Sequence, residues 1–309
     1  MKQIFVNLKR FDVPRQLGGI CPVDDPKQWI EGIIAESVQY GLGQLPNLQV
    51  TFLLPEALII PAKEKIACYE NEQVKNISIG CQGVYRENVA PGGNFGAFTT
   101  NLPAAAAKNL GCAWALIGHS EERKDKLGVI GRFEPLYNDT DEMRTKAARA
   151  VDSLINEEVI KALDADLNVL LCVGETAEQR GGGSFAEQQP RIKAALEDQL
   201  TSGLKGVADK LLNRDVVIGY EPVWAIGPGK TPPDGEYISF VSAYIKAVVI
   251  EKFGFDPAVV YGGGLKEENA GMIAQIKTIG GGLVALTKFS GDIAFEPAGL
   301  KNIIKKYVD

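Results

Sequence analysis

Two side chains in this chain of 309 residues have the chemistry and the placement of an acid–base pair. Glu221 directly follows the apolar, β-branched segment 215–219, so its carboxylate stands where a buried strand gives way to a loop. His119 is the single histidine and follows the apolar segment 113–118 in the same way. The residues after it, 120–123, are typical of a helix start, and the positive end of a helix dipole favours a neutral imidazole. The carboxylate could act as an acid or a base, and a neutral imidazole can donate one N–H to a carbonyl oxygen.

A lysine and an asparagine follow the first apolar run of the chain. Asn7 and Lys9 flank Leu8 in an extended segment, so both side chains can point the same way while the leucine points back. An ammonium group there can stabilise a developing oxyanion or hold a phosphate as a point charge. Taken alone, Lys9 with Arg10 could equally be a solvated pair, and His119 could be a structural cap. Three such groups at strand ends together favour the catalytic interpretation.

The segment after Glu221 could close over a site at that position. An apolar patch at 223–226 precedes glycines at 227 and 229, and glycine lets backbone N–H groups approach an anion closely. A surface loop with a buried tryptophan is the alternative. A second glycine run, 262–264, follows another apolar segment; it could contribute to a phosphate site, although a tight turn is the default interpretation. The single histidine and scattered cysteines predict no metal site, and we expect no cofactor.

These residues lie within a regular alternation of short apolar runs and longer amphipathic segments. The apolar runs are 4–6, 50–54, 76–80, 113–118, 168–174, 215–219, 258–262 and 283–286. Helices are expected at 26–39, from Pro61 to 69, at 103–108 and 140–165, after the glycine break at 181–184, and at 234–252, 266–276 and 297–307. Eight alternations predict one α/β domain, 1–309, built as a closed eight-stranded parallel β/α barrel, with a doubly wound open sheet as the alternative. In a barrel, the carboxyl ends of the strands form the active face, so the polar residues above would meet there.

Composition and charge narrow the class of partner and the compartment. A formal net charge of −6 argues against nucleic acid or an anionic membrane as the main partner. Five cysteines without a Cys-x-x-Cys pair suit reduced thiols rather than a disulfide framework. The amino-terminal apolar run is too short for a signal peptide, and no apolar stretch is long enough to span a bilayer. We therefore expect a cytoplasmic protein.

Five of the segments named above together resemble the triosephosphate isomerase family. They are 7–9 (NLK), 117–121 (IGHSE), 172–175 (CVGE), 220–227 (YEPVWAIG) and 261–263 (YGG), in the same order and at matching strand ends. The resemblance covers most of the chain, and it implies a TIM barrel that binds a small phosphorylated sugar.

The resemblance also implies a role for each of the polar residues. Glu221 would be the base that moves a proton between adjacent carbons, and His119 the neutral group that polarises the carbonyl. Lys9 would stabilise the enediolate, and Asn7 would help to bind substrate. Behind these residues would lie Glu121 and Cys172. Residues 222–230 would form a closing lid.

The phosphate end departs from the family pattern. The resemblance implies backbone N–H donors at Gly227, at Gly264 in place of a serine, and at Ala285 and Leu286 in place of a pair of glycines. Two side chains would therefore crowd the phosphate, and leucine does not readily adopt the φ angles open to glycine. Pro228 replaces the usual threonine at the lid tip, which removes one N–H and stiffens the tip.

The loop around 96–99 resembles the one that joins subunits in this family and implies a homodimer. However, Asn101 stands in place of a glutamate, and Glu122 in place of the arginine that this glutamate would pair with. These changes predict a rebuilt interface. Extra residues near 11–26 and 124–139 account for the length beyond a typical member.

The expected activity is the interconversion of glyceraldehyde 3-phosphate and dihydroxyacetone phosphate. Two alternatives stay open at this point. One is an isomerase of another small ketose or aldose phosphate, such as a tetrulose phosphate. The other is a catalytically silent sugar-phosphate-binding paralogue.

Overall fold

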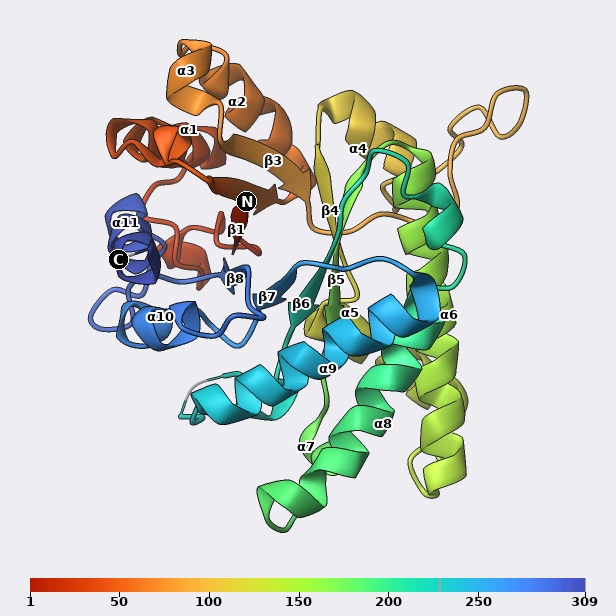
Figure 1. The fold of residues 1–309 in the computed structure, drawn as a ribbon. Helices are drawn as coiled ribbons and strands as arrows, with labels where there is room; N and C mark the ends of the chain where they lie inside the picture. Colours follow the sequence, from red (N-terminus) through yellow and green to blue (C-terminus); the bar gives the residue numbers. More distant parts are fainter. Residues whose placement is uncertain (228, 309) are drawn as a thin grey trace.

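The strands of the computed structural model, which describes residues 1–227 and 229–308, form a closed parallel barrel (Figure 1). In chain order they are β1 Lys2–Asn7, β2 Leu48–Leu54, β3 Ile77–Cys81, β4 Trp114–Ile117, β5 Asn168–Val173, β6 Val216–Tyr220, β7 Val259–Tyr261 and β8 Gly281–Val284. Each strand pairs with the next, and β1 pairs with both β2 and β8. The closure confirms the predicted eight-stranded β/α barrel and excludes the open doubly wound sheet.

The strands are mostly apolar because both of their faces are largely buried. Alternate residues point into the barrel and form an inner core: Phe5, Leu53, Trp114, Leu116, Leu170, Cys172, Val217, Val260 and Leu283. Within it the rings of Phe5 and Trp114 meet edge to face with centroids 4.9 Å apart. The intervening residues pack outward against the helices, so the barrel interior is filled and the polar strand ends are carried on a rigid base.

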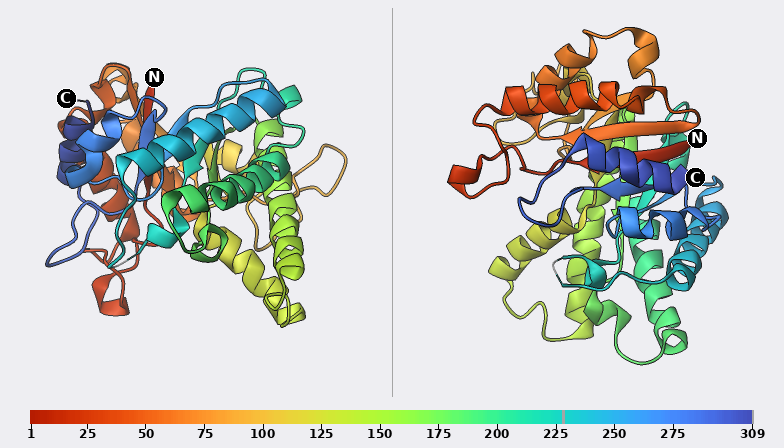
Figure 2. Two further views of the ribbon diagram at one scale, coloured as in Figure 1. Left: turned by 60° about the horizontal axis from the view of Figure 1, so that its bottom comes forward. Right: turned by 90° about the vertical axis from the view of Figure 1, so that its left-hand side faces the viewer.

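The helices surround the barrel (Figure 2). They are α1 Pro26–Gln39, α2 Glu56–Ile66, α3 Asn71–Val74, α4 Ala104–Leu110, α5 Ser120–Phe133, α6 Asp141–Asp164, α7 Ala177–Arg180, α8 Phe185–Gly203, α9 Gly235–Phe253, α10 Glu267–Ala274 and α11 Pro297–Val308. In the part of the chain that the structure describes, none of them is long and apolar enough to cross a membrane.

Two predicted boundaries are wrong. The helix expected to open at Pro61 begins five residues earlier, at Glu56, so Pro61 lies inside α2 rather than at its first position. Pro55 ends β2 and serves as the N-cap, so the chain turns into the helix at once. The eighth strand ends at Val284, which places Ala285 and Leu286 in the following loop.

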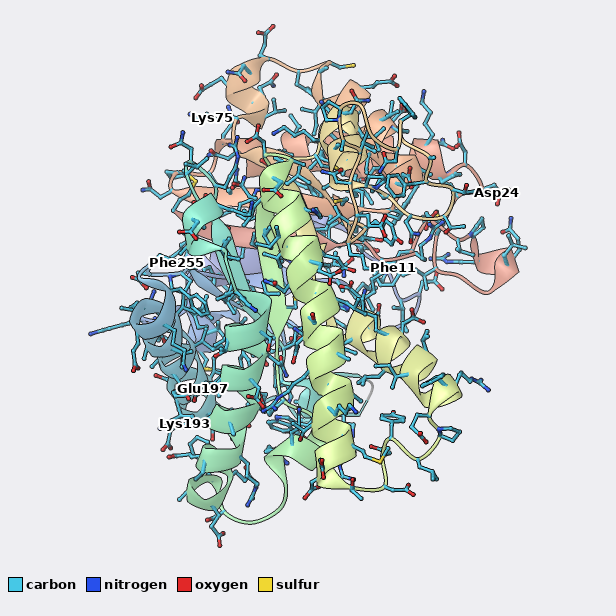
Figure 3. All side chains as sticks on the ribbon, turned by 90° about the vertical axis from the view of Figure 1, so that its right-hand side faces the viewer. Phe11, Asp24, Lys75, Lys193, Glu197 and Phe255 are labelled. Atoms are coloured by element: carbon cyan, nitrogen blue, oxygen red, sulfur yellow. The ribbon has the colours of Figure 1, made fainter. Side chains whose placement is uncertain are left out.

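The segment after β4 is more extensively helical than its sequence indicated. A helix start was expected at 120, and the structure shows the 14-residue helix α5, followed by the 24-residue helix α6. α6 stands between α5 and α8, which carries Lys193 and Glu197 (Figure 3). The insertion near 124–139 thus lengthens the helix that begins at the active face.

Candidate active site

A cavity of about 1530 Å³ opens at the carboxyl ends of the strands. Its wall contains every residue expected to touch substrate: Asn7, Lys9, His119, Glu221, Gly227, Gly264, Ala285 and Leu286. Because these residues come from the ends of β1, β4, β6, β7 and β8, only closure of the barrel brings them together. Glu121 also lines the cavity, whereas Cys172 lies in the filled interior below it.

The carboxylate of Glu221 and the imidazole of His119 are in direct contact. Nε2 of His119 lies 3.2 Å from Oε1 of Glu221, and the two side chains are 12% and 3% exposed. The backbone N–H of Ser120 donates to Oε2 of Glu221 at 2.9 Å, and its hydroxyl lies 3.4 Å from Oε1. The resting carboxylate therefore sits at the amino terminus of α5, where the helix dipole and a peptide N–H stabilise its charge.

His119 is held in one tautomer by the helix that it caps. As the N-cap of α5, its Nδ1 accepts a hydrogen bond from the backbone N–H of Glu121 at 3.2 Å. An acceptor nitrogen carries no proton, so the proton of the neutral ring is on Nε2, the atom that faces Glu221. A protonated ring would instead place two N–H groups against each other. The contact with the Glu121 N–H therefore favours the arrangement predicted from the sequence, in which the imidazole presents its Nε2–H to the site.

Lys9 reaches the cavity from a left-handed backbone conformation, with φ at 45°. Its Nζ bonds to Oε1 of Glu121 at 2.5 Å, and its own N–H donates to Oδ1 of Asn7 at 3.0 Å. Partial burial would raise the pKa of Glu121, but the bond from Lys9 and its charge hold that pKa below its ordinary value. An ion pair therefore fixes the ammonium at the wall of the cavity.

Gln82 and Ser120 belong to this arrangement, although neither was predicted as a site residue. The amide nitrogen of Gln82 donates to Oδ1 of Asn7 and to the carbonyl oxygen of Lys9, both at 3.1 Å. It thereby supports the strained backbone at Lys9. A signal was available, since Gln82 directly follows β3 and Ser120 follows the strand-end histidine. The rule of polar strand ends, applied to every strand, would have found both.

Cys172 contributes apolar packing and one electrostatic relation to the base. Its thiol is fully buried in β5. Burial, and then the nearby carboxylate of Glu221, raise the pKa of this thiol well above its ordinary value. The side chain therefore stays an uncharged thiol beneath the base and does not reach the cavity.

The start of the predicted lid is fastened to the loop after β5. The indole N–H of Trp224 donates to Oε1 of Glu175 at 2.7 Å, and the same oxygen accepts from Tyr237 at 2.7 Å and from Tyr220 at 3.0 Å. The guanidinium of Arg180 covers the indole ring at 3.7 Å. Burial raises the pKa of Glu175 above its ordinary value, although the three donors oppose that rise. Any movement of the lid must break the bond between Trp224 and this carboxylate.

At the phosphate end, two glycines have positive φ angles and two residues with side chains do not. Gly227 and Gly264 have φ angles of 118° and 88°, which other residues rarely adopt. Ala285 and Leu286 both lie outside the left-handed region. The backbone after β8 is therefore one that residues with side chains accept without strain. The proline predicted to stiffen the lid tip, Pro228, lies outside the described residues.

Comparison with known proteins gives one consistent result. A family model described as "Triosephosphate isomerase" matches residues 43–296. The chain is 30% identical over 268 residues to the triosephosphate isomerase of Alkaliphilus metalliredigens, covering 84% of this chain and 91% of that protein. It is 36% identical over 193 residues to that of Chloroherpeton thalassium, covering 61% of this chain and 64% of that protein's length.

A solved structure shows the same fold. The triosephosphate isomerase of Bartonella henselae superimposes with a TM-score of 0.66 at 20% identity, over 100% of this chain and 99% of that one. At this identity the likeness describes the architecture of the barrel alone.

Proposed function

The chain belongs to the triosephosphate isomerase family, and on that premise we propose that it interconverts glyceraldehyde 3-phosphate and dihydroxyacetone phosphate. One observation carries the proposal. The carboxylate of Glu221 and the Nε2–H of His119 meet at 3.2 Å in the wall of a cavity that also holds the ammonium of Lys9. A base, a neutral hydrogen-bond donor and a fixed positive charge are the three groups that proton transfer next to a carbonyl requires.

The proposed reaction moves one proton between adjacent carbons and leaves the overall composition unchanged. Glu221 removes the proton from the carbon beside the carbonyl, while His119 donates its Nε2–H to the carbonyl oxygen. Lys9 stabilises the negative charge of the enediolate. The hydroxyl proton of the deprotonated carbon passes by way of Nε2 of His119 to the former carbonyl oxygen, and Glu221 then returns its proton to the former carbonyl carbon. This family is itself the standard example of that division of labour between a carboxylate and a neutral imidazole. For the first step, Glu221 must exchange its bonds to Ser120 for the substrate.

The phosphate of the substrate would bind at the other end of the cavity. We place it between the ammonium of Lys9 and backbone N–H groups near Gly227, Gly264 and Leu286, which all line the same cavity. Ala285 and Leu286 line this end of the cavity and carry side chains where the family has two glycines. They therefore leave less space around the phosphate group than glycines would.

An isomerase of a larger sugar phosphate is the second candidate, and the size of the cavity favours it. A volume of about 1530 Å³ exceeds that of an ordinary ligand pocket, roughly 300–1,000 Å³, so a tetrulose phosphate would also be accommodated. A silent sugar-phosphate-binding paralogue is the third. The intact contact of Glu221 with His119, and the charge of Lys9 beside them, favour turnover over binding alone.

A substrate panel tests these three functions on the purified chain. We expect kcat/KM for the two triose phosphates to exceed that for tetrulose phosphates by at least about tenfold, because a methylene and a hydroxyl must be accommodated near the reacting carbons. A preference for the tetrulose would support the second candidate. Calorimetric binding of the triose phosphates without turnover would support the third.

We further propose that the chain forms a homodimer and that it resides in the cytoplasm. The loop that includes 96–99 projects from the barrel (Figure 1), and the side chain of Phe95, directly before these residues, is 91% exposed. An exposed phenylalanine on a projecting loop favours contact with a second subunit. Light scattering should give twice the chain mass, and a monomer would contradict it. The five cysteines are all unpaired thiols, which fits a reducing compartment.

A further inference from the structure

Gly118, which precedes His119, is hydrogen-bonded through its N–H and through its carbonyl oxygen to two consecutive residues of α5. Gly118 has a φ of 74°, a conformation that strongly favours glycine. Its N–H donates to Oε2 of Glu122 at 2.7 Å, and its carbonyl oxygen accepts from Nε of Arg123 at 2.8 Å. The turn that aims the imidazole is therefore held by one acidic and one basic side chain.

Both side chains are linked to α6, Arg123 directly and Glu122 through Lys126 of α5. Oε1 of Glu122 accepts from Nζ of Lys126 at 2.6 Å, and the same ammonium lies 2.9 Å from Oε1 of Glu158. Arg123 pairs with Asp152 at 2.5 Å. The acidic branch is well shielded from solvent, since the side chains of Glu122, Lys126 and Glu158 are 22%, 20% and 5% exposed. We call Glu122, Lys126 and Glu158 the α5–α6 relay.

α5 has few apolar contacts with the rest of the molecule. None of its residues is fully buried: Leu127 and Ile130 pack half-buried against the core, whereas Val129 and Phe133 are 66% and 91% exposed. Hydrophobic burial, which normally positions a helix, is therefore limited here. Polar contacts with α6 thus contribute much of what orients α5 and the imidazole at its first turn.

The relay contains two carboxyl groups and one ammonium. Their surroundings leave one carboxyl group protonated and the other ionised. Burial, and then the neighbouring Glu122, raise the pKa of Glu158 to about 9, so it keeps its proton near neutral pH. Burial also acts to raise the pKa of Glu122, but its bonds to Glu158 and Lys126 hold it below the ordinary value. Glu122 is thus an ionised acceptor for the Gly118 N–H, compensated by the ammonium.

We propose that Glu122 is a positioning residue for catalysis, which, held by Lys126 and Glu158, fixes the Gly118 turn and thereby aims Nε2–H of His119 into the site. In the sequence, Glu122 stood out only because it replaces an arginine, a change that predicts a rebuilt subunit interface. In the structure its side chain bonds to the N–H of Gly118 and to Lys126. The expected effect on kcat rests on the proposed isomerase function, whereas the expected effect on the position of the imidazole does not.

Because His119 is the only histidine, its imidazole can be observed directly. Protein labelled with nitrogen-15 in histidine gives one pair of ring nitrogen signals, and the wild type should show the Nε2–H tautomer. In Glu122→Leu, which removes the acceptor, we expect a mixture of tautomers and a kcat lowered about 10- to 100-fold with KM within about twofold. The double variant Glu122→Gln with Lys126→Met keeps a neutral acceptor without a buried unpaired charge. It should restore most of the wild-type signal and rate.

Asp125→Leu is the matched control. Asp125 is exposed on the same helix, and its side chain makes no hydrogen bond or ion pair within residues 1–227 and 229–308, so its loss should change neither the ring signals nor kcat. Unchanged ring signals in a folded Glu122→Leu protein would overturn the proposal. If Glu122→Leu does not fold, Lys126→Met alone must shift the ring signals in the same direction, and its failure to do so would overturn the proposal as well. The ring signals are measured without substrate, so they test the positioning role even if the wild type turns over no triose phosphate.

Discussion

Replacing Glu221 by glutamine is expected to lower kcat by about 10²- to 10⁴-fold, the contribution typical of a positioned general base. Glutamine has nearly the same size and can still accept the N–H of Ser120, so the fold and the shape of the cavity should be preserved. It cannot accept a proton from carbon. KM should change little, because in the proposed binding mode the substrate is held through its phosphate at the other end of the cavity. A coupled turnover assay and a thermal melt of the same preparation measure both effects.

The control for this variant is Glu251→Gln. Glu251 is exposed on α9, away from the carboxyl ends of the strands. Its replacement changes the net charge by the same amount as Glu221→Gln. We expect wild-type kcat for it. An activity of Glu221→Gln within a few-fold of the wild type would show that another group removes the proton.

Replacing His119 by asparagine should lower kcat by about 10²- to 10³-fold while the melting temperature stays close to that of the wild type. The histidine has two separable roles in the structure. Its Nδ1 caps α5 by accepting the N–H of Glu121, and its Nε2 faces Glu221. Asparagine is among the best N-cap residues, so it can replace the first contact. Its side chain is too short to place a donor where Nε2–H stands, and loss of one such donor costs about this factor in rate.

His119→Ala separates the two roles. It should lose the same catalytic factor and, in addition, about 1 kcal/mol of unfolding free energy, because the cap is also removed. Chemical denaturation of the two variants gives that difference. If His119→Asn kept full activity, the imidazole would be a structural cap only, which was the alternative for a histidine at this position.

The sequence predicted the barrel, and the gathering of the candidate site residues in one cavity, because both follow from local patterns. Continuous apolar runs mark strands buried on both faces, and polar residues directly after them mark the active face. Glu221, His119 and Lys9 were found by that rule, and their proximity follows from strand order. Gln82 obeys the same rule, since it directly follows β3, although it was not among the predicted residues.

The relay behind His119 could not be predicted from local patterns. Glu122, Lys126 and Glu158 look like ordinary charged positions on two helices, and only the packing of α5 against α6 turns them inward. The misplaced start of α2 has a different cause. Pro61 suits the first position of a helix, but the strand before it ends at Leu54 and Pro55 already provides the turn. Tertiary context decided between two prolines that are locally equivalent.

The most direct test of the account is the conversion of glyceraldehyde 3-phosphate in deuterium oxide, followed by proton NMR. If Glu221 carries the proton between the two carbons, its carboxylic acid exchanges with solvent before delivery. The wild type should then form dihydroxyacetone phosphate with deuterium at C1, and Glu221→Gln should form it about 10²- to 10⁴-fold more slowly. The account would be contradicted if the wild type formed no product, if the product wholly retained the original hydrogen, or if Glu221→Gln formed product at the wild-type rate.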